Sequence, residues 1–364
     1  MLNAGMGVFM DDRQKNYYKW FKKCITALIA AVAGSFALFW VIDPYFHFHK
    51  PFDFISYRLY DERYINDGIS RHFDYDMIIT GTSMAQNFKT SEADRLFGVR
   101  AVKETFSGAD YNELSENLER ALKYNGNLKY VIWTMDFNSL MRDKDYKAYE
   151  GYPTYLYDDN PFNDVSYVFN KSIWYHGVMT NLFMTLADKP STTFDEYSSW
   201  EKETGYEHIM ETYDRWEEKA DMAPGLNDDD RVMVEQNVRQ NFIELVNKHP
   251  DTTFYIFYTP YSIVWWDFMN QEGMMRMQFD AELIATELFI ECPNVKLFNF
   301  YDKYDIITNL DNYRDKEHYG SHINSKILGW IAAGDGLVTR DNYLERLKAE
   351  EDYYLGYDYE SIFK

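Results

Sequence analysis

Three polar side chains from two distant parts of the sequence could together carry out acyl transfer. Ser83 follows the apolar residues 77–79 and a short turn, whereas Asp315 and His318 lie three residues apart near the other end of the chain. A serine hydroxyl becomes a nucleophile when a base takes its proton, and that base needs a carboxylate to orient it. The sequence therefore supplies a candidate nucleophile, base and orienting carboxylate.

Each part of this set has a plainer explanation when it is taken alone. Ser83 and the threonine before it could simply cap a helix, and the spacing of Asp315 and His318 is equally typical of a solvated loop. His322 competes for the role of base, and Asn87 is a further polar residue that could line the site. It is the conjunction of a serine with an Asp-x-x-His pair that favours catalysis.

Strands that alternate with helices would bring these residues together. Short apolar or β-branched runs predict strands at 77–80, 99–105, 130–135, 252–258 and 295–300. Helical spacing of apolar residues follows or separates them, at 91–98, 111–125, 231–248, 279–290 and 323–333. The alternation predicts an α/β fold whose central parallel sheet has about five strands and helices on both faces.

In such a sheet, residues that follow the carboxyl ends of the strands gather at one edge, where ligands bind. Ser83 follows the first predicted strand and precedes a segment that we expect to be helical. Backbone N–H groups and the dipole of that helix could then stabilise an oxyanion beside Ser83.

An uncharged stretch near the amino terminus predicts a single-pass membrane anchor. Residues 24–42 carry no charge and are long enough to cross about 30 Å of hydrocarbon as a helix. Residues 1–42 have a net charge of +3 and the remainder carries −25, with the basic side chains on the amino-terminal flank. This asymmetry predicts a cytoplasmic amino terminus and an extracytoplasmic carboxyl-terminal domain. A cleaved signal peptide and a buried soluble helix are the alternatives.

Composition also bears on partners and cofactors. A net charge of −22 argues against a nucleic-acid partner, which needs a basic surface. Cys24 and Cys292 are not expected to pair, and no Cys/His spacing suggests a zinc site or another cofactor. His47 and His49 could face one metal, but their aromatic surroundings favour a juxtamembrane stem.

These observations divide the chain into segments. We expect a cytoplasmic basic terminus (1–23), the anchor (24–42), a stem (43–69), an α/β domain (70–335) and an acidic tail (336–364). A long insertion interrupts the domain at 139–230, and we expect it to be partly helical. Its tryptophans could stack on sugars or pack in the core, and they are Trp174, Trp200 and Trp216.

The residues that follow the predicted strands resemble the sequence blocks of SGNH/GDSL hydrolases. The blocks are Gly-Thr-Ser83, Phe-Ser-Gly108, Asp-Phe-Asn138 and Asp315-x-x-His318, although Thr82 replaces the usual aspartate of the first. The anchor and stem resemble a membrane-anchored branch that modifies bacterial cell surfaces. That branch includes teichoic-acid D-alanine transfer proteins and exopolysaccharide O-acetylation proteins.

The resemblance implies a flavodoxin-like three-layer α/β/α fold with Ser83 as nucleophile, His318 as base and Asp315 as its orienter. It implies oxyanion donors at Ser83, Gly108 and Asn138. The implied activity is that of an esterase or O-acyltransferase, which passes acetyl or D-alanyl to cell-surface polysaccharide or teichoic acid through an acyl-serine. A multipass membrane acyltransferase is the implied partner. The alternative is a non-catalytic surface protein that binds glycan or organises an assembly.

Overall fold

A six-stranded sheet forms the centre of the protein in a computed structural model that describes residues 11–149, 152–200 and 203–364. The strand order is β2-β1-β3-β4-β5-β6, with the first five strands parallel and β6 antiparallel to β5. The strands are β1 (Met77–Gly81), β2 (Ala101–Thr105), β3 (Tyr130–Met135), β4 (Thr253–Tyr258), β5 (Val295–Asn299) and β6 (Leu337–Val338). The order 2-1-3-4-5 is the flavodoxin-like order, so the predicted fold class is confirmed.

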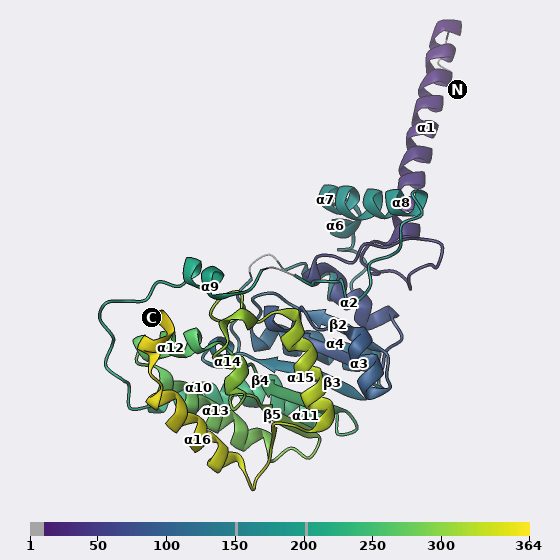
Figure 1. Cartoon of the computed structure of the whole chain (residues 1–364). Coiled ribbons are helices and arrows are strands. Elements are labelled where there is room, and N and C mark those ends of the chain that lie inside the picture. Colours follow the sequence, from purple (N-terminus) through teal and green to yellow (C-terminus); the bar gives the residue numbers. More distant parts are fainter. Residues whose placement is uncertain (1–10, 150–151, 201–202) are drawn as a thin grey trace, which may run out of the picture.

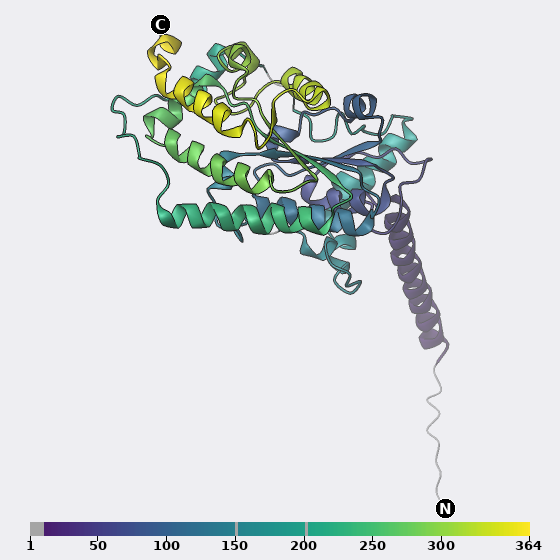
Figure 2. The same cartoon turned by 90° about the horizontal axis from the view of Figure 1, so that it is seen from below.

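Helices cover both faces of the sheet, which is why β1, β3 and β4 are almost continuously apolar or β-branched. Every residue of β1 is buried, and so is every residue of β3 and β4 after the first. On one face α3 packs against α15, and on the other α4, α10, α11 and α13 form a second layer (Figure 2). The helices of these layers are α3 (Thr90–Phe97), α4 (Tyr111–Tyr124), α10 (Asp228–Val238), α11 (Glu244–Lys248), α13 (Met275–Phe289) and α15 (Ser321–Ala333).

The remaining elements connect or cover these layers. Those of the α/β body are α2 (Glu62–His72), η1 (Ser83–Ala85), α5 (Phe137–Leu140), the π-turn η4 (Arg239–Ile243), α12 (Ile263–Gln271), α14 (Tyr304–Ile307), η5 (Leu310–Asn312), α16 (Tyr343–Gly356) and η6 (Tyr359–Phe363). The insertion contributes η2 (Thr154–Leu156), α6 (Val165–Val168), α7 (Lys171–Ile173), the π-turn η3 (Trp174–Val178), α8 (Met179–Leu186) and α9 (Tyr206–Thr212).

The acidic carboxyl-terminal segment 336–364 is folded against the α/β body. Residues 337–338 form the sixth strand, and α16 packs on α13. Tyr354 of α16 is buried and stacks on Trp266 at a centroid distance of 3.9 Å. A strand of two residues has no periodicity to detect, which explains why only about five strands were predicted.

Helix α12, which follows β4, was likewise not predicted from the sequence. Seven of its nine residues are buried, Asp267 and Gln271 among them. A helix that is buried on nearly every side shows no alternation of polar and apolar faces, so the 3.6-residue period is absent. Ser262 begins this helix, since its hydroxyl accepts hydrogen bonds from the N–H groups of Val264 and Trp265.

A single long helix, α1 (Asp12–Ile42), extends away from the α/β body (Figure 1). Its most apolar 18-residue stretch has a mean hydropathy of 2.3, and only 11% of that stretch is buried. The helix is long and apolar enough to span a membrane. It begins within the basic segment rather than at residue 24, and residues 1–10 of the predicted cytoplasmic terminus lie outside the described part of the chain.

Candidate functional site

Ser83 is held in a tight turn at the carboxyl end of β1. Gly81 ends that strand with φ of +145°, and a Cβ atom there would lie 2.1 Å from Oγ1 of Thr134 on β3. Only glycine allows this approach of the two strands. Ser83 then opens the three-residue turn η1, and the next α-helix begins at Thr90. The expectation of a helix dipole directly behind Ser83 is therefore wrong, because one 3₁₀ turn has little dipole to offer.

His318 and Asp315 lie on a narrow loop that leads into α15. Tyr313 and Tyr319 form an antiparallel bridge at the base of this loop. At its tip, Oδ1 of Asp315 accepts hydrogen bonds from the backbone N–H groups of Glu317 (2.9 Å) and His318 (2.8 Å). This turn, in which an aspartate side chain bonds the backbone two and three residues on, fixes the carboxylate beside the histidine ring.

The loop brings His318 between the other two predicted residues. Nε2 of His318 lies 2.8 Å from Oγ of Ser83, and Nδ1 lies 2.9 Å from each carboxylate oxygen of Asp315. An ionised carboxylate can only accept hydrogen bonds, so Nδ1 carries the proton of the neutral ring and Nε2 is free to accept the serine proton. This is the arrangement of a nucleophile, a general base and its orienting group.

Charge around His318 favours its protonated form. Burial alone lowers the pKa of His318, but the hydrogen bond and negative charge of Asp315 outweigh it, with help from Glu317 and Asp136, so the pKa is raised. Burial likewise raises the pKa of Asp315, but the hydrogen bond and charge of His318 bring it below its ordinary value. Both side chains remain about one quarter exposed, so a substrate can reach them.

Trp200 of the insertion covers one side of this arrangement. Its ring meets the His318 ring edge to face at 5.4 Å, and its indole N–H donates to the carbonyl oxygen of Ser83 at 3.4 Å. Oδ1 of Asn87 accepts from the backbone N–H of Trp200 at 2.8 Å. Asn87, predicted as a lining residue, is buried and instead holds the insertion against the site.

Ser83 opens into a cavity of about 190 Å³. Gly108 and Asn138 line the same cavity and are exposed, while their role as oxyanion donors stays a prediction. The charged residues that line the cavity are Asp110, Asp136, Arg142 and Glu317. The wall is therefore mainly acidic.

Asp136 is a cavity residue that the sequence analysis did not single out. One carboxylate oxygen accepts from the hydroxyl of Thr82 (2.8 Å), and the other accepts from Tyr261 (2.9 Å). Burial raises the pKa of Asp136, and these two hydrogen bonds oppose that rise. Because it follows β3 directly, the rule that sites gather at the carboxyl ends of strands could have identified it.

The competing base His322 lies elsewhere. Its Nε2 atom is 3.0 Å from Oδ1 of Asn312, and burial lowers its pKa. The stem histidines also have separate partners, since Nε2 of His47 pairs with Asp164 and Nε2 of His49 lies against the carbonyl oxygen of Trp40. Within the described ranges, the histidine, cysteine and acidic side chains form no group of three or more that could hold a metal ion.

Comparisons with known proteins do not assign this chain to a family. No protein-family model matches the sequence, and no curated protein is similar to it. Among solved structures, the chain is similar to one described as "a putative platelet activating factor from Streptococcus pneumonia". The match covers 84% of this chain and 98% of that one, with 11% sequence identity and a TM-score of 0.38. A similarity of this size adds nothing to the geometry described above.

Proposed function

We propose that this protein is an extracytoplasmic, membrane-anchored serine esterase or O-acyltransferase. The observation that carries the proposal is the contact of Ser83 with His318, across 235 residues of sequence, together with the contact of His318 with Asp315. A serine, a histidine and a carboxylate in this order and geometry form a catalytic triad on several unrelated folds.

The chemistry begins at Oγ of Ser83. Nε2 of His318 takes the hydroxyl proton while Oγ attacks the carbonyl carbon of an acyl ester, and Asp315 stabilises the imidazolium that forms. Backbone N–H groups at Ser83 and Gly108, together with Asn138, are the proposed donors to the oxyanion. His318 then returns the proton to the departing alcohol, which leaves an acyl-serine. A hydroxyl of the acceptor, or water, releases the acyl group by the same steps in reverse.

The cavity beside Ser83 supports a short acyl group. A volume of about 190 Å³ is below the usual size of pockets for whole drug-sized ligands, about 300–1,000 Å³. An acetyl or D-alanyl group fits this space, whereas a long acyl chain would have to leave it. We propose hydroxyls of cell-surface polysaccharide or teichoic acid as acceptors and a multipass membrane acyltransferase as the partner that supplies the acyl group.

The long apolar helix supports the proposed location. Helix α1 is the proposed single-pass anchor in the cytoplasmic membrane, with the amino terminus in the cytoplasm. Lys19, Lys22 and Lys23 precede its apolar stretch, as expected for a cytoplasmic flank. The α/β domain would then act outside the cell membrane, close to the lipid surface.

Hydrolysis of p-nitrophenyl acetate by the full-length protein in detergent micelles tests the nucleophile. We expect Ser83→Ala to lower kcat/KM by at least about 10³-fold, as removal of a triad nucleophile does in other enzymes. Ser172→Ala is the matched control, because Ser172 is an exposed serine of α7 and should leave the rate unchanged. Equal rates in the wild type and in a folded Ser83→Ala variant would refute the proposal and favour a non-catalytic glycan-binding protein.

A further inference from the structure

Part of the insertion has an apolar surface that no other described element covers. Residues 165–187 contain Lys171 as their single Asp, Glu, Lys or Arg residue, in a chain with 26% charged residues. Leu186 is 78% exposed and Phe162, just before this stretch, is 86% exposed. The other exposed large apolar residues here are Val165, Phe169, Tyr175, Met179 and Phe183. We call residues 162–186 the apolar platform.

The exposed side chains lie on one side of the helical segment from α7 to α8. Tyr175, Met179, Phe183 and Leu186 recur every three or four residues, which places them on a common face. The opposite face is buried and includes the polar Asn181. A helix on the surface of a water-soluble domain has the reverse pattern, with its apolar face inward.

Polar contacts on the buried face hold the platform firmly to the stem. Oδ1 of Asn181 accepts a hydrogen bond from the backbone N–H of Arg58 at 2.9 Å. The hydroxyl oxygen of Thr185 accepts one from the backbone N–H of Ser56, also at 2.9 Å. Gly177 packs so closely that a Cβ atom there would lie 2.7 Å from Cβ of Pro44. The apolar face therefore cannot turn inward without breaking these contacts.

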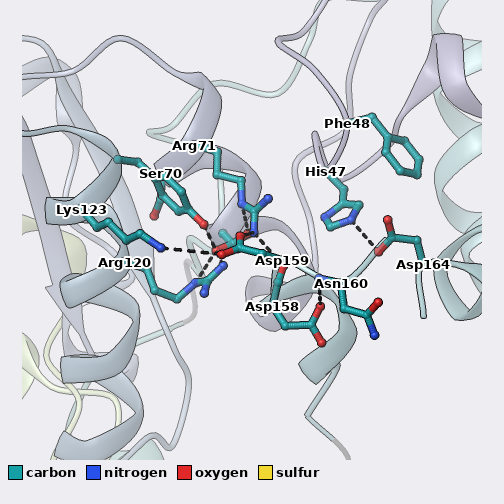
Figure 3. Close-up of polar contacts among 12 residues, drawn as sticks. His47, Phe48, Ser70, Arg71, Arg120, Lys123, Asp158, Asp159, Asn160 and Asp164 are labelled. Carbon is teal, nitrogen blue, oxygen red and sulfur yellow. Dashed lines mark hydrogen bonds and ion pairs between the residues drawn. The ribbon is translucent and has the colours of Figure 1, made fainter. Parts of the chain in front are cut away.

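A hydrogen bond and two ion pairs also tie the start of the platform and the chain before it to the stem and the α/β body. Asp164 lies 3.0 Å from Nε2 of His47 in the stem (Figure 3). Asp159 lies near Arg71 of α2 and Lys123 of α4, at 3.8 and 3.7 Å (Figure 3). Asp159 and Asp164 are thus turned toward the stem and the α/β body, away from the exposed apolar side chains.

Contacts with α1 fix the depth of the platform along the proposed anchor. Phe169 meets Phe36 edge to face at 5.2 Å, and Trp174 lies 5.4 Å from Phe39. Phe36 precedes Ile42, the last residue of α1, by six residues, which is about 9 Å along the helix at 1.5 Å per residue. Helices α6, α7 and α8 lie beside this end of α1, on the side of the body from which α1 leaves (Figure 1).

We propose that the apolar platform enters the outer leaflet of the membrane beside α1. An exposed apolar surface at the depth of Phe36 meets acyl chains if α1 spans the bilayer, and exposed aromatic and aliphatic side chains with few charges are suited to that environment. The inference rests on the membrane anchor of the proposed function. The occupant of this surface is lipid rather than a second protein.

The platform would fix the orientation of the catalytic site as well as its distance from the membrane. The chain leaves α8 and pairs with the stem, where the backbone N–H of Thr192 donates to the carbonyl oxygen of Tyr57 at 2.9 Å. It then reaches Trp200, which packs on His318. A single helix alone leaves a domain free to tilt, whereas two attachments hold Ser83 at a set position above the lipid. This suits acceptors that are themselves tethered to the membrane.

Electron paramagnetic resonance on the full-length protein in phosphatidylglycerol nanodiscs tests the proposal. Cys24→Ser and Cys292→Ala remove the native thiols, and a nitroxide label is attached at Phe183→Cys. The matched control is Leu344→Cys, because Leu344 is 58% exposed on α16 of the α/β body. Ile29→Cys, 63% exposed on α1, reports the anchor itself.

We expect the labels at residues 183 and 29 to be more accessible to oxygen than to the water-soluble relaxant nickel-EDDA, and the label at residue 344 to show the opposite order. A label at 183 that behaves like the one at 344 would overturn the platform while leaving the anchor intact. Shielding of residue 183 from both relaxants would also overturn it, in favour of a contact with another copy of the protein. Nickel access at residue 29 would refute the anchor, and the platform with it. The esterase assay on Ser83→Ala tests the catalytic claim separately.

Discussion

Replacing Asp315 with asparagine gives a sharp test of the role assigned to His318. Oδ1 of Asp315 already accepts the backbone N–H groups of Glu317 and His318, so the carbonyl oxygen of an asparagine would stay at that position. Its NH₂ group would then take the place of Oδ2, which lies 2.9 Å from Nδ1 of His318. Nδ1 also lies 2.9 Å from Oδ1, but the two lone pairs of that oxygen already accept the two backbone N–H groups. The amide N–H therefore donates to Nδ1, and the ring proton moves to Nε2. In that tautomer Nε2 cannot accept the proton of Ser83.

The expected size of the effect follows from this change of tautomer. In a serine protease with the same arrangement, the equivalent replacement lowers kcat by about 10⁴-fold. That factor corresponds to about 5.4 kcal/mol of lost transition-state stabilisation. The fold should survive, because the asparagine keeps both backbone hydrogen bonds and has the same size.

The pH dependence gives a second readout of the Asp315→Asn variant. The base must be neutral to act, so activity rises with pH through the pKa of His318, which lies above its ordinary value of about 6.5 in the wild type. Asparagine removes the charge and hydrogen bond that stabilise the imidazolium. The pKa of His318 should therefore fall, and the acidic limb of the kcat/KM profile should move to lower pH while the plateau drops.

The assay is p-nitrophenyl acetate hydrolysis by the full-length protein from pH 5 to 9, with circular dichroism as the check on folding. Asp311→Asn is the matched control, since Asp311 is an exposed carboxylate of η5 in the preceding segment. Its profile should overlay that of the wild type. An Asp315→Asn variant with kcat/KM within threefold of the wild type, and with an unmoved acidic limb, would refute the role assigned to Asp315.

Two further substitutions test the geometry around the serine. Gly81→Ala should lower the free energy of unfolding by at least about 2 kcal/mol, because the new methyl group would collide with Thr134 at a φ that disfavours alanine. Denaturant titration measures this, and an unchanged midpoint would contradict the close packing of β1 on β3. His322→Ala should keep ester hydrolysis within about twofold of the wild type, because His322 contacts Asn312 and not Ser83. A loss as large as that of His318→Ala would instead make His322 the base.

Much of the sheet could be predicted because its strands are buried on both faces. Residues 130–135 and 253–258 are continuous runs of apolar, aromatic and β-branched side chains, and such runs between turn residues predict buried strands. Strand order could not be derived from residues alone, and the flavodoxin-like arrangement came from the resemblance. The missed elements lack a detectable period for different reasons, since β6 has only two residues and α12 is buried on nearly every side.

The candidate site was predictable where it depends on local sequence and on the rule that ligands bind at the carboxyl ends of parallel strands. It was not predictable where it depends on the insertion. The Asp-x-x-His spacing lets one loop hold Asp315 against His318, and Ser83 follows a strand that ends at the same edge of the sheet. Trp200 reaches the site only because the insertion folds back across 117 residues, which no local pattern reveals. Asn87 has an unremarkable local sequence, and its contact with Trp200 is equally a product of tertiary folding.

The insertion links the proposed membrane attachment to the catalytic site. Its first part carries the apolar platform beside α1, and a later part places Trp200 on His318. On this account, the insertion sets where the site stands relative to the membrane as well as how the base is shielded from water.

The most direct test of the central claim is covalent labelling of the full-length protein with a fluorophosphonate probe, read by peptide mass spectrometry. The account predicts a single labelled serine, Ser83, and at least about 10³-fold slower labelling in His318→Ala because the hydroxyl has lost its base. Labelling of Ser83 at the wild-type rate in His318→Ala, or no labelling of Ser83 in the folded wild-type protein, would contradict an activated nucleophile at this position.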